Sequence, residues 1–155
     1  MKERIGKNIS LAARILLLLY LLLLLYLTFL STRFSRGIDL RGINLVPFST
    51  ISQYLFGYMT TKSIIINLAG NIVAFMPFGF ILPLAFRVFH KFAKTTLLTF
   101  LLTFLIEIGQ YVTSSGISDI DDIILNVLGG ILGYILFCGA FQIYEAFKRH
   151  NFRKA

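Results

Sequence analysis

The sequence predicts an all-α integral membrane protein: a four-helix bundle with both termini in the cytoplasm and a short interfacial helix in the first outer loop. Hydrophobic residues make up 57% of the 155 residues and charged residues 14%, with a mean hydropathy of +0.80. Soluble domains carry roughly 45–50% apolar and about 25% charged residues. The same composition excludes disorder, and the single Cys138 excludes a disulfide scaffold. The length predicts a single membrane domain over residues 1–155.

Long stretches with almost no charge predict the transmembrane helices, because about 20 apolar residues span a hydrocarbon core of about 30 Å. The first apolar run could also be a signal peptide. It is longer than a usual signal-peptide core, and residues 31–33 form a poor cleavage site, so we expect it to be retained. Pro77 and Pro83 fall inside the second stretch and predict a kink there, with two half-helices as the alternative. The four predicted spans cover residues 11–30, 63–86, 95–112 and 123–147.

The distribution of Lys and Arg predicts the orientation. Eleven of the fifteen basic residues lie in the N-terminal flank, in the loop 87–94 and in the C-terminal tail. Basic residues concentrate on the cytoplasmic side, so both termini are predicted to be cytoplasmic. The net charge of +8 is then mostly a topology signal and an attraction to anionic lipid, and no nucleic-acid partner is predicted.

A short helix is predicted in the first outer loop, beginning near Pro47. Ile51, Tyr54, Leu55 and Tyr58 follow at helical spacing and would form one apolar face. Tyrosine suits the membrane–water interface, because its ring is apolar and its hydroxyl is wet. We therefore expect an interfacial helix; a helix packed over the mouth of the bundle would give the same pattern.

Polar residues concentrate near the outer ends of the second, third and fourth spans. Within each pair that shares a helix the spacing is three or four residues, which places the pair on one helix face. Polar side chains avoid lipid, so these faces should turn toward one another and form an outward-facing polar cleft. The residues of this predicted polar cluster are Asn67, Asn71, Glu107, Gln110, Asp119, Asp121, Asp122 and Asn126.

Structural roles compete with functional ones in this cluster. The amides could simply join helices, and Asp119 or Asp122 could cap the last helix. Glu107 favours function, because an ionisable residue inside a span is rare. The four carboxylates also require compensation: protonation of Glu107, a bound divalent cation with oxygen ligands, or an arginine from the first outer loop. Candidate arginines are Arg33, Arg36 and Arg41.

Other features predict packing rather than chemistry. Gly129 and Gly133, with Gly130 beside them, form a small-xxx-small face that allows a neighbouring helix to approach closely. The outer side contains no Ser/His/Asp set, no Cys/His set and no zinc spacing, so no catalytic residue and no metal ligand is assigned.

Four blocks of the sequence resemble the VanZ-like family of small bacterial membrane proteins. They are INLVPFSTI (43–51), NLAGNIVAFMPFGFILPL (67–84), IEIGQ (106–110) and DIDDIILNVLGGILGY (119–134). The resemblance implies a role in the bacterial envelope, because the family's namesake lowers susceptibility to teicoplanin. Many relatives carry an arginine before the acidic run, where this chain has residues 114–116 as Ser-Ser-Gly. Positions that match the family are Asn67, Asn71, Pro77, Glu107, Gln110, Asp119, Asp122, Asn126 and Gly129.

Together these observations predict a multi-pass, non-enzymatic protein of the bacterial cytoplasmic membrane. Its polar cleft would bind a membrane lipid or a lipid-linked cell-wall precursor and so reduce capture by glycopeptide antibiotics of the teicoplanin type. The alternative is a membrane enzyme that modifies an envelope lipid, with Glu107 as general acid or base and the three aspartates 119, 121 and 122 holding a divalent cation. A third hypothesis is a scaffold for other envelope proteins.

Overall fold

Among the residues that the structure describes, four helices are long and apolar enough to cross a membrane, which confirms the four long apolar helices that the sequence predicts. The computed structural model describes residues 2–30, 42–57, 61–113 and 115–153. Every span boundary lies at most three residues from its predicted position. The spanning segments are Asn8–Leu30, Ile65–Ala85, Phe92–Thr113 and Ile120–Phe147.

Several of these helices are extended or preceded by shorter elements. The first helix, α1 (Lys2–Leu25), continues as a π-helical turn, η1 (Tyr26–Leu30). A helical turn α3 (Thr61–Ile64) and a second π-helical turn η2 (Ile65–Ala69) lead into α4 (Gly70–Ala85). The remaining elements are α2 (Ser49–Phe56), η3 (Arg87–Phe89), α5 (Phe92–Thr113), α6 (Ile120–Arg153) and the strands β1 (Ile43–Asn44) and β2 (Ser118–Asp119).

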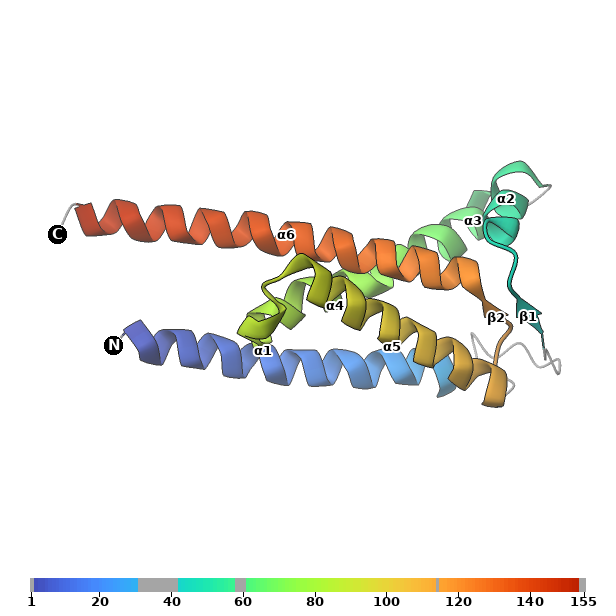
Figure 1. Ribbon diagram of the computed structural model, residues 1–155, viewed down its shortest axis with the longest axis horizontal. Coiled ribbons are helices and arrows are strands. Elements are labelled where there is room, and N and C mark those ends of the chain that lie inside the picture. Colours follow the sequence, from blue (N-terminus) through green and yellow to red (C-terminus); the bar gives the residue numbers. More distant parts are fainter. Residues whose placement is uncertain (1, 31–41, 58–60, 114, 154–155) are drawn as a thin grey trace.

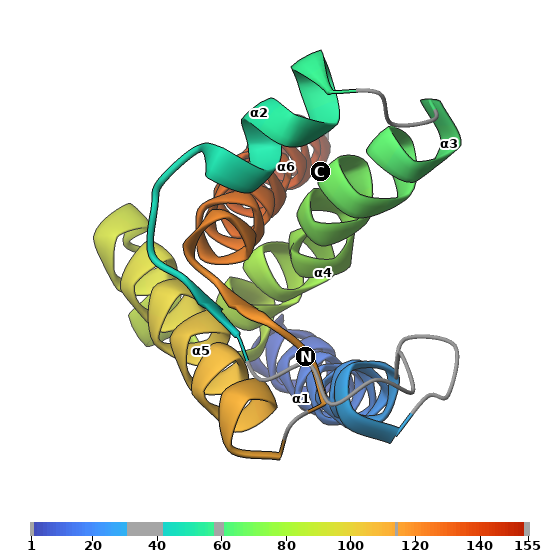
Figure 2. The ribbon, with the colours of Figure 1, turned by 90° about the vertical axis from the view of Figure 1, so that its right-hand side faces the viewer.

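Helix α4 lies at the centre of the bundle. It packs against α1 on one side and against α6 on the other, and α5 packs against α6. The view from the end of the bundle shows these four helices around one another, with α2 lying across the start of α6 (Figure 2). α1 begins and α6 ends at the same end of the bundle, where both extend beyond the turn between α4 and α5 (Figure 1).

The apolar core lies mainly between α4 and two of its neighbours, α1 and α5. A smaller cluster joins α1, α4 and α5 and consists of Leu24, Phe75 and Ile106. In the most apolar 18-residue stretch of each span, 17–33% of the residues are buried inside the protein. Most side chains of the spans therefore face outward, as expected for helices surrounded by lipid. The larger core cluster contains Ala13, Leu17, Phe78, Ile81, Leu82 and Ala85.

The backbones of α4 and α6 touch along a line of glycines. A methyl group placed on Gly129 would lie 2.1 Å from the carbonyl oxygen of Ile72, and one on Gly133 would lie 2.0 Å from that of Met76. These distances are far below a van der Waals contact. Glycine is therefore required on α6 wherever its backbone meets α4, as in other close helix pairs of membrane proteins.

Helix α4 continues through both of its prolines. Pro77 and Pro83 lie inside the helix Gly70–Ala85, so this segment is one helix and not the pair of half-helices considered as an alternative. One turn before Pro77, the Tyr20 hydroxyl of α1 donates a hydrogen bond to the carbonyl oxygen of Ala74. Such side-chain donors satisfy backbone acceptors near a proline, where the regular hydrogen-bond ladder is interrupted.

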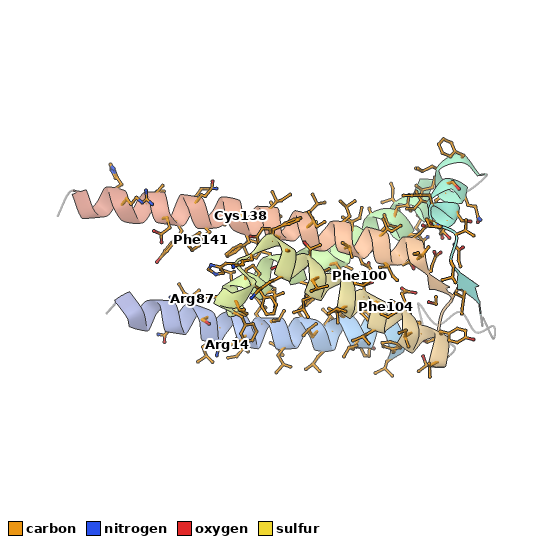
Figure 3. The ribbon with its side chains drawn as sticks, in the orientation of Figure 1. Arg14, Arg87, Phe100, Phe104, Cys138 and Phe141 are labelled. Atoms are coloured by element: carbon orange, nitrogen blue, oxygen red, sulfur yellow. The ribbon has the colours of Figure 1, made fainter. Side chains whose placement is uncertain are left out.

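The end of α4 is capped by side chains of α1. The carbonyl oxygen of Ala85 accepts hydrogen bonds from the Ser10 hydroxyl at 2.8 Å and from Arg14 Nε at 3.2 Å. The Arg14 guanidinium also lies over the Phe86 ring, 4.9 Å from its centroid, beside the α4–α5 turn that carries Arg87 (Figure 3). A cation at the C-terminus of a helix complements its dipole, and a free carbonyl gains a donor.

The two loops at the opposite end are joined to each other. β1 and β2 form a parallel pair in which Ile43 lies opposite Ser118 and Asn44 lies opposite Asp119. This pairing brings residues 43–44 to the beginning of α6. The predicted short helix is present as α2, two residues after Pro47, and it contacts both α3 and α6. Its interfacial position stays a prediction.

Candidate functional site

Asp119 is the N-cap of α6, which is one of the two capping roles considered from the sequence. Its Oδ1 accepts the backbone N–H of Asp121 at 2.9 Å, the hydrogen bond that an N-cap makes to the second residue of a helix. The same oxygen accepts from the Asn44 side-chain amide at 3.1 Å, and Oδ2 accepts from the Thr50 hydroxyl. One buried carboxylate therefore starts α6 and fastens β1 and α2 to it.

Asp121 caps a different helix. Its side chain is fully buried, and its two oxygens accept the backbone N–H groups of Phe48 at 2.5 Å and Ile51 at 3.0 Å. These donors lie at the N-terminus of α2, on the residue before the helix and in its first turn, where backbone N–H groups have no partner within the helix. We call Asp119 and Asp121 the outer clamp, because together they hold residues 43–51 against the start of α6.

Glu107, a residue of α5, supports the start of α6. Its side chain is 3% exposed, and Oε2 accepts the backbone N–H of Asp119 at 2.8 Å. In a capping box, a glutamate of the helix itself binds the N–H of the N-cap residue. Here a glutamate of the neighbouring helix does so, and this bond ties α5 to α6 at the end of the bundle that carries β1 and β2.

Asp122 and Asn71 form a hydrogen bond between α6 and α4. The Asn71 side-chain amide donates to Asp122 Oδ1 at 2.6 Å. Both residues are only half-buried, in contrast to Glu107 and the outer clamp. Asp122 lies in the first turn of α6, where a negative charge is favoured by the helix dipole. Asp122 is thus the half-buried carboxylate of the cluster, whereas Glu107, Asp119 and Asp121 are buried.

Asn126 lies one turn deeper on α6 and binds α5. Its amide nitrogen donates to the Thr103 hydroxyl at 2.7 Å, and its Oδ1 is buried without a donor among the residues that the structure describes. Thr103 belongs to a fully buried threonine line on α5 with Thr95 and Thr99. Sequence reasoning missed this line, although its four-residue spacing continues to Glu107 and places all four side chains on one helix face.

Two further predicted residues, Asn67 and Gln110, are also half-buried. Asn67 lies half-buried in the π-helical turn η2, one turn before Asn71. Gln110 is half-buried near Gly116, where an added methyl group would lie 3.3 Å from the Gln110 side-chain nitrogen. The candidate arginines Arg33, Arg36 and Arg41 lie outside the described residues.

The carboxylates of the cluster are engaged in hydrogen bonds among the described residues. Within the described part of the chain, the donors to these carboxylates are neutral groups: backbone N–H groups, side-chain amides and a hydroxyl. Among the described residues, no group of three or more Asp, Glu, His or Cys side chains is placed to hold a metal ion. The divalent cation considered from the sequence stays a prediction. The half-buried amide and carboxylate can offer both donors and acceptors to a polar ligand.

The spans and the polar cluster define a multi-pass helical membrane protein with a hydrogen-bonded polar cluster at one end. The profile of the VanZ/LLP1 family matches residues 17–143, and the chain belongs to this family. It is 33% identical over 100 residues to Protein VanZ of Enterococcus faecium, an alignment that covers 63% of this chain and 53% of that relative. The match thus spans about half of the relative's length. No solved structure matches the chain significantly.

Proposed function

We propose that this protein lowers the susceptibility of a bacterium to glycopeptide antibiotics of the teicoplanin type. It would do so by binding a lipid-linked head group or cell-wall precursor at the outer face of the cytoplasmic membrane. Membership of the VanZ/LLP1 family and the similarity to Protein VanZ support the envelope role. A bound precursor is less available to an antibiotic that must capture the same molecule, so protection needs binding and no chemical turnover.

The orientation proposed from the charges agrees with the arrangement of the helices. The start of α1, the turn between α4 and α5 and the end of α6 carry most of the basic residues, and they lie toward one end of the bundle. By the positive-inside bias that end is cytoplasmic. The outer clamp and the Asn71–Asp122 pair then lie at the outer end, with α2 at the outer membrane interface.

The half-buried Asn71–Asp122 pair is the observation that carries the proposal. Its hydrogen bond joins α4 and α6, and both side chains retain some accessible surface, as does Asn67 one turn away. A head group at this depth would meet an amide donor and carboxylate acceptors, which suit sugar hydroxyls and peptide amides. Glu107, Asp119, Asp121 and Asn126 are buried and would support this surface from behind.

The test is drug susceptibility in a sensitive Gram-positive host that expresses each variant at a matched membrane level. Wild type should protect against teicoplanin more than against vancomycin, and Asp122→Asn and Glu107→Gln should lose that protection. Gly139→Ala is the control, because a methyl group there meets nothing within 4 Å. Undiminished protection in Asp122→Asn would contradict the assigned site, and absence of protection by wild type would contradict the resistance role.

Binding and catalysis are distinguished by a second measurement. Mass spectrometry of envelope extracts, with and without the protein, should show the same lipids and muropeptides. Purified protein in vesicles should retain a lipid-linked precursor in proportion to its own amount. A new envelope species whose formation stops when divalent ions are chelated would instead support the alternative of a membrane enzyme.

A further inference from the structure

Residues 42–57 expose an apolar surface that shares only Leu55 with the apolar helix face predicted from the sequence. Residues 42–57 contain no Asp, Glu, Lys, Arg or His. Five large apolar side chains of this segment are between 54% and 87% exposed. We call them the apolar platform; they are Leu45, Val46, Phe48, Leu55 and Phe56.

The opposite side of the same segment is held by the protein. Ile51 and Tyr54 of α2 are half-buried, and the backbone N–H groups of Phe48 and Ile51 bind the buried carboxylate of Asp121. Asn44 and Thr50 bind Asp119. The exposure of the platform is therefore a fixed property of the fold, because hydrogen bonds to two buried carboxylates prevent the segment from turning its apolar side inward.

The position of the platform identifies what covers it. β1 pairs with β2, and the next residue after β2, Ile120, begins the fourth span. On the other side, the second span begins at Ile65, eight residues after Gly57. Figure 1 shows β1 and α2 together at this end of the bundle. A segment tied so closely to two span ends lies at the level where head groups meet acyl chains.

We propose that the apolar platform inserts into the hydrocarbon boundary of the membrane leaflet at this end of the bundle. Its occupant is lipid, because a segment without charge that exposes Phe and Leu is favoured at that boundary, whereas the same surface in water would be unfavourable. The inserted platform fixes the depth of the neighbouring Asn71–Asp122 pair at the head-group level. The inference requires only the membrane spans and does not depend on the proposed resistance role.

The chain contains no tryptophan, so a single substitution gives a clean fluorescent reporter. Phe56→Trp is conservative at the most exposed platform position, which is 87% exposed. The full chain carrying this change is reconstituted in phosphatidylcholine vesicles with lipids brominated at shallow or deep acyl positions. Leu19→Trp, at an outward-facing position inside the first span, is the reference for deep insertion, and free tryptophan amide is the aqueous reference.

The Phe56→Trp emission should be shifted to the blue and quenched most by shallow bromine, whereas Leu19→Trp should be quenched most by deep bromine. Quenching of Phe56→Trp by aqueous iodide to the extent seen for the free amide, without bromine quenching, would overturn the proposal. Blue-shifted emission that bromine does not quench would also overturn it and would indicate a protein cover. Dependence of that emission on the protein-to-lipid ratio would identify the cover as a second copy of the chain.

Discussion

The carboxylate of Asp121 accepts the backbone N–H of Phe48, although the two residues are 73 positions apart in the chain. Phe48 is the one non-glycine residue with a positive φ among the described residues, at 64°. This left-handed conformation is unfavourable for a bulky residue and persists only where the surroundings enforce it. A fully buried aspartate holds Phe48 here, so the backbone at the start of α2 is fixed by a residue in the first turn of α6.

Replacing Asp121 should release α2 and destabilise the protein. Asp121→Ala leaves the N–H groups of Phe48 and Ile51 without their acceptors, and loss of a helix cap costs about 1–2 kcal/mol. We expect a lower free energy of unfolding in detergent micelles, together with faster hydrogen exchange in residues 43–56. Hydrogen-exchange mass spectrometry reports the local change separately from global stability.

Asp121→Asn is the matched control for the cap. Asparagine retains one acceptor oxygen and can therefore keep one of the two backbone hydrogen bonds. Its stability and exchange rates should lie between those of wild type and Asp121→Ala. Equal exchange in residues 43–56 for all three proteins would show that Asp121 does not hold α2.

The glycines of α6 should differ sharply in their tolerance of a methyl group. At Gly129 and Gly133 the added carbon would lie about 2 Å from carbonyl oxygens of α4, whereas at Gly139 it meets nothing within 4 Å. Overpacking of this kind costs about 1–3 kcal/mol. We therefore expect Gly129→Ala and Gly133→Ala to unfold at lower SDS fractions than wild type.

Gly139→Ala provides the comparison within the same helix. Alanine is favoured over glycine in a helix by about 1 kcal/mol, so this variant should equal or slightly exceed wild type in stability. A loss of stability at Gly139 as large as that at Gly129 would mean that the effect comes from the helix itself and not from contact with α4.

The hydrogen bond between Asn126 and Thr103 should contribute modestly to the α5–α6 contact. Interhelical side-chain hydrogen bonds in membrane proteins couple by about 0.6 kcal/mol on average. Asn126→Leu, Thr103→Val and the double variant form a double-mutant cycle, measured by unfolding in micelles. A coupling energy indistinguishable from zero would show that the 2.7 Å contact does not stabilise the protein.

The spans were predictable because membrane helices are recognised by their length and hydropathy. Their boundaries follow from the positions of the charged residues that flank each apolar stretch. The pairing of β1 with β2 was not predictable. It involves two residues of each loop, and so short a contact between distant segments leaves no periodic pattern. The start of α2 near Pro47 was visible, but the remote cap from Asp121 was not.

The polar cluster could be located but not sorted by role. Counting residues from the span ends brought Glu107 and the three aspartates to one depth, which is where the structure has them hydrogen-bonded. The sequence offered Asp119 or Asp122 as a cap of the last helix but could not choose between them, because spacing gives no information on burial or partners. Only the fold separates Asp119 and Asp121, which start two helices, from the half-buried Asp122.

That separation gives a prediction which contrasts two neighbouring aspartates. The Asp119 carboxylate accepts hydrogen bonds from the Asp121 N–H, Asn44 and Thr50. Asp119→Asn removes one of its acceptor oxygens, so the free energy of unfolding should fall by about 1–2 kcal/mol. Asp122→Asn keeps an acceptor for Asn71 and removes only the charge, so stability should change little. If Asp122 faces the ligand, teicoplanin protection per folded molecule should fall in Asp122→Asn and persist in Asp119→Asn. The opposite pattern, measured as susceptibility against the amount of folded protein in the membrane, would move the binding surface from the Asn71–Asp122 pair to the outer clamp.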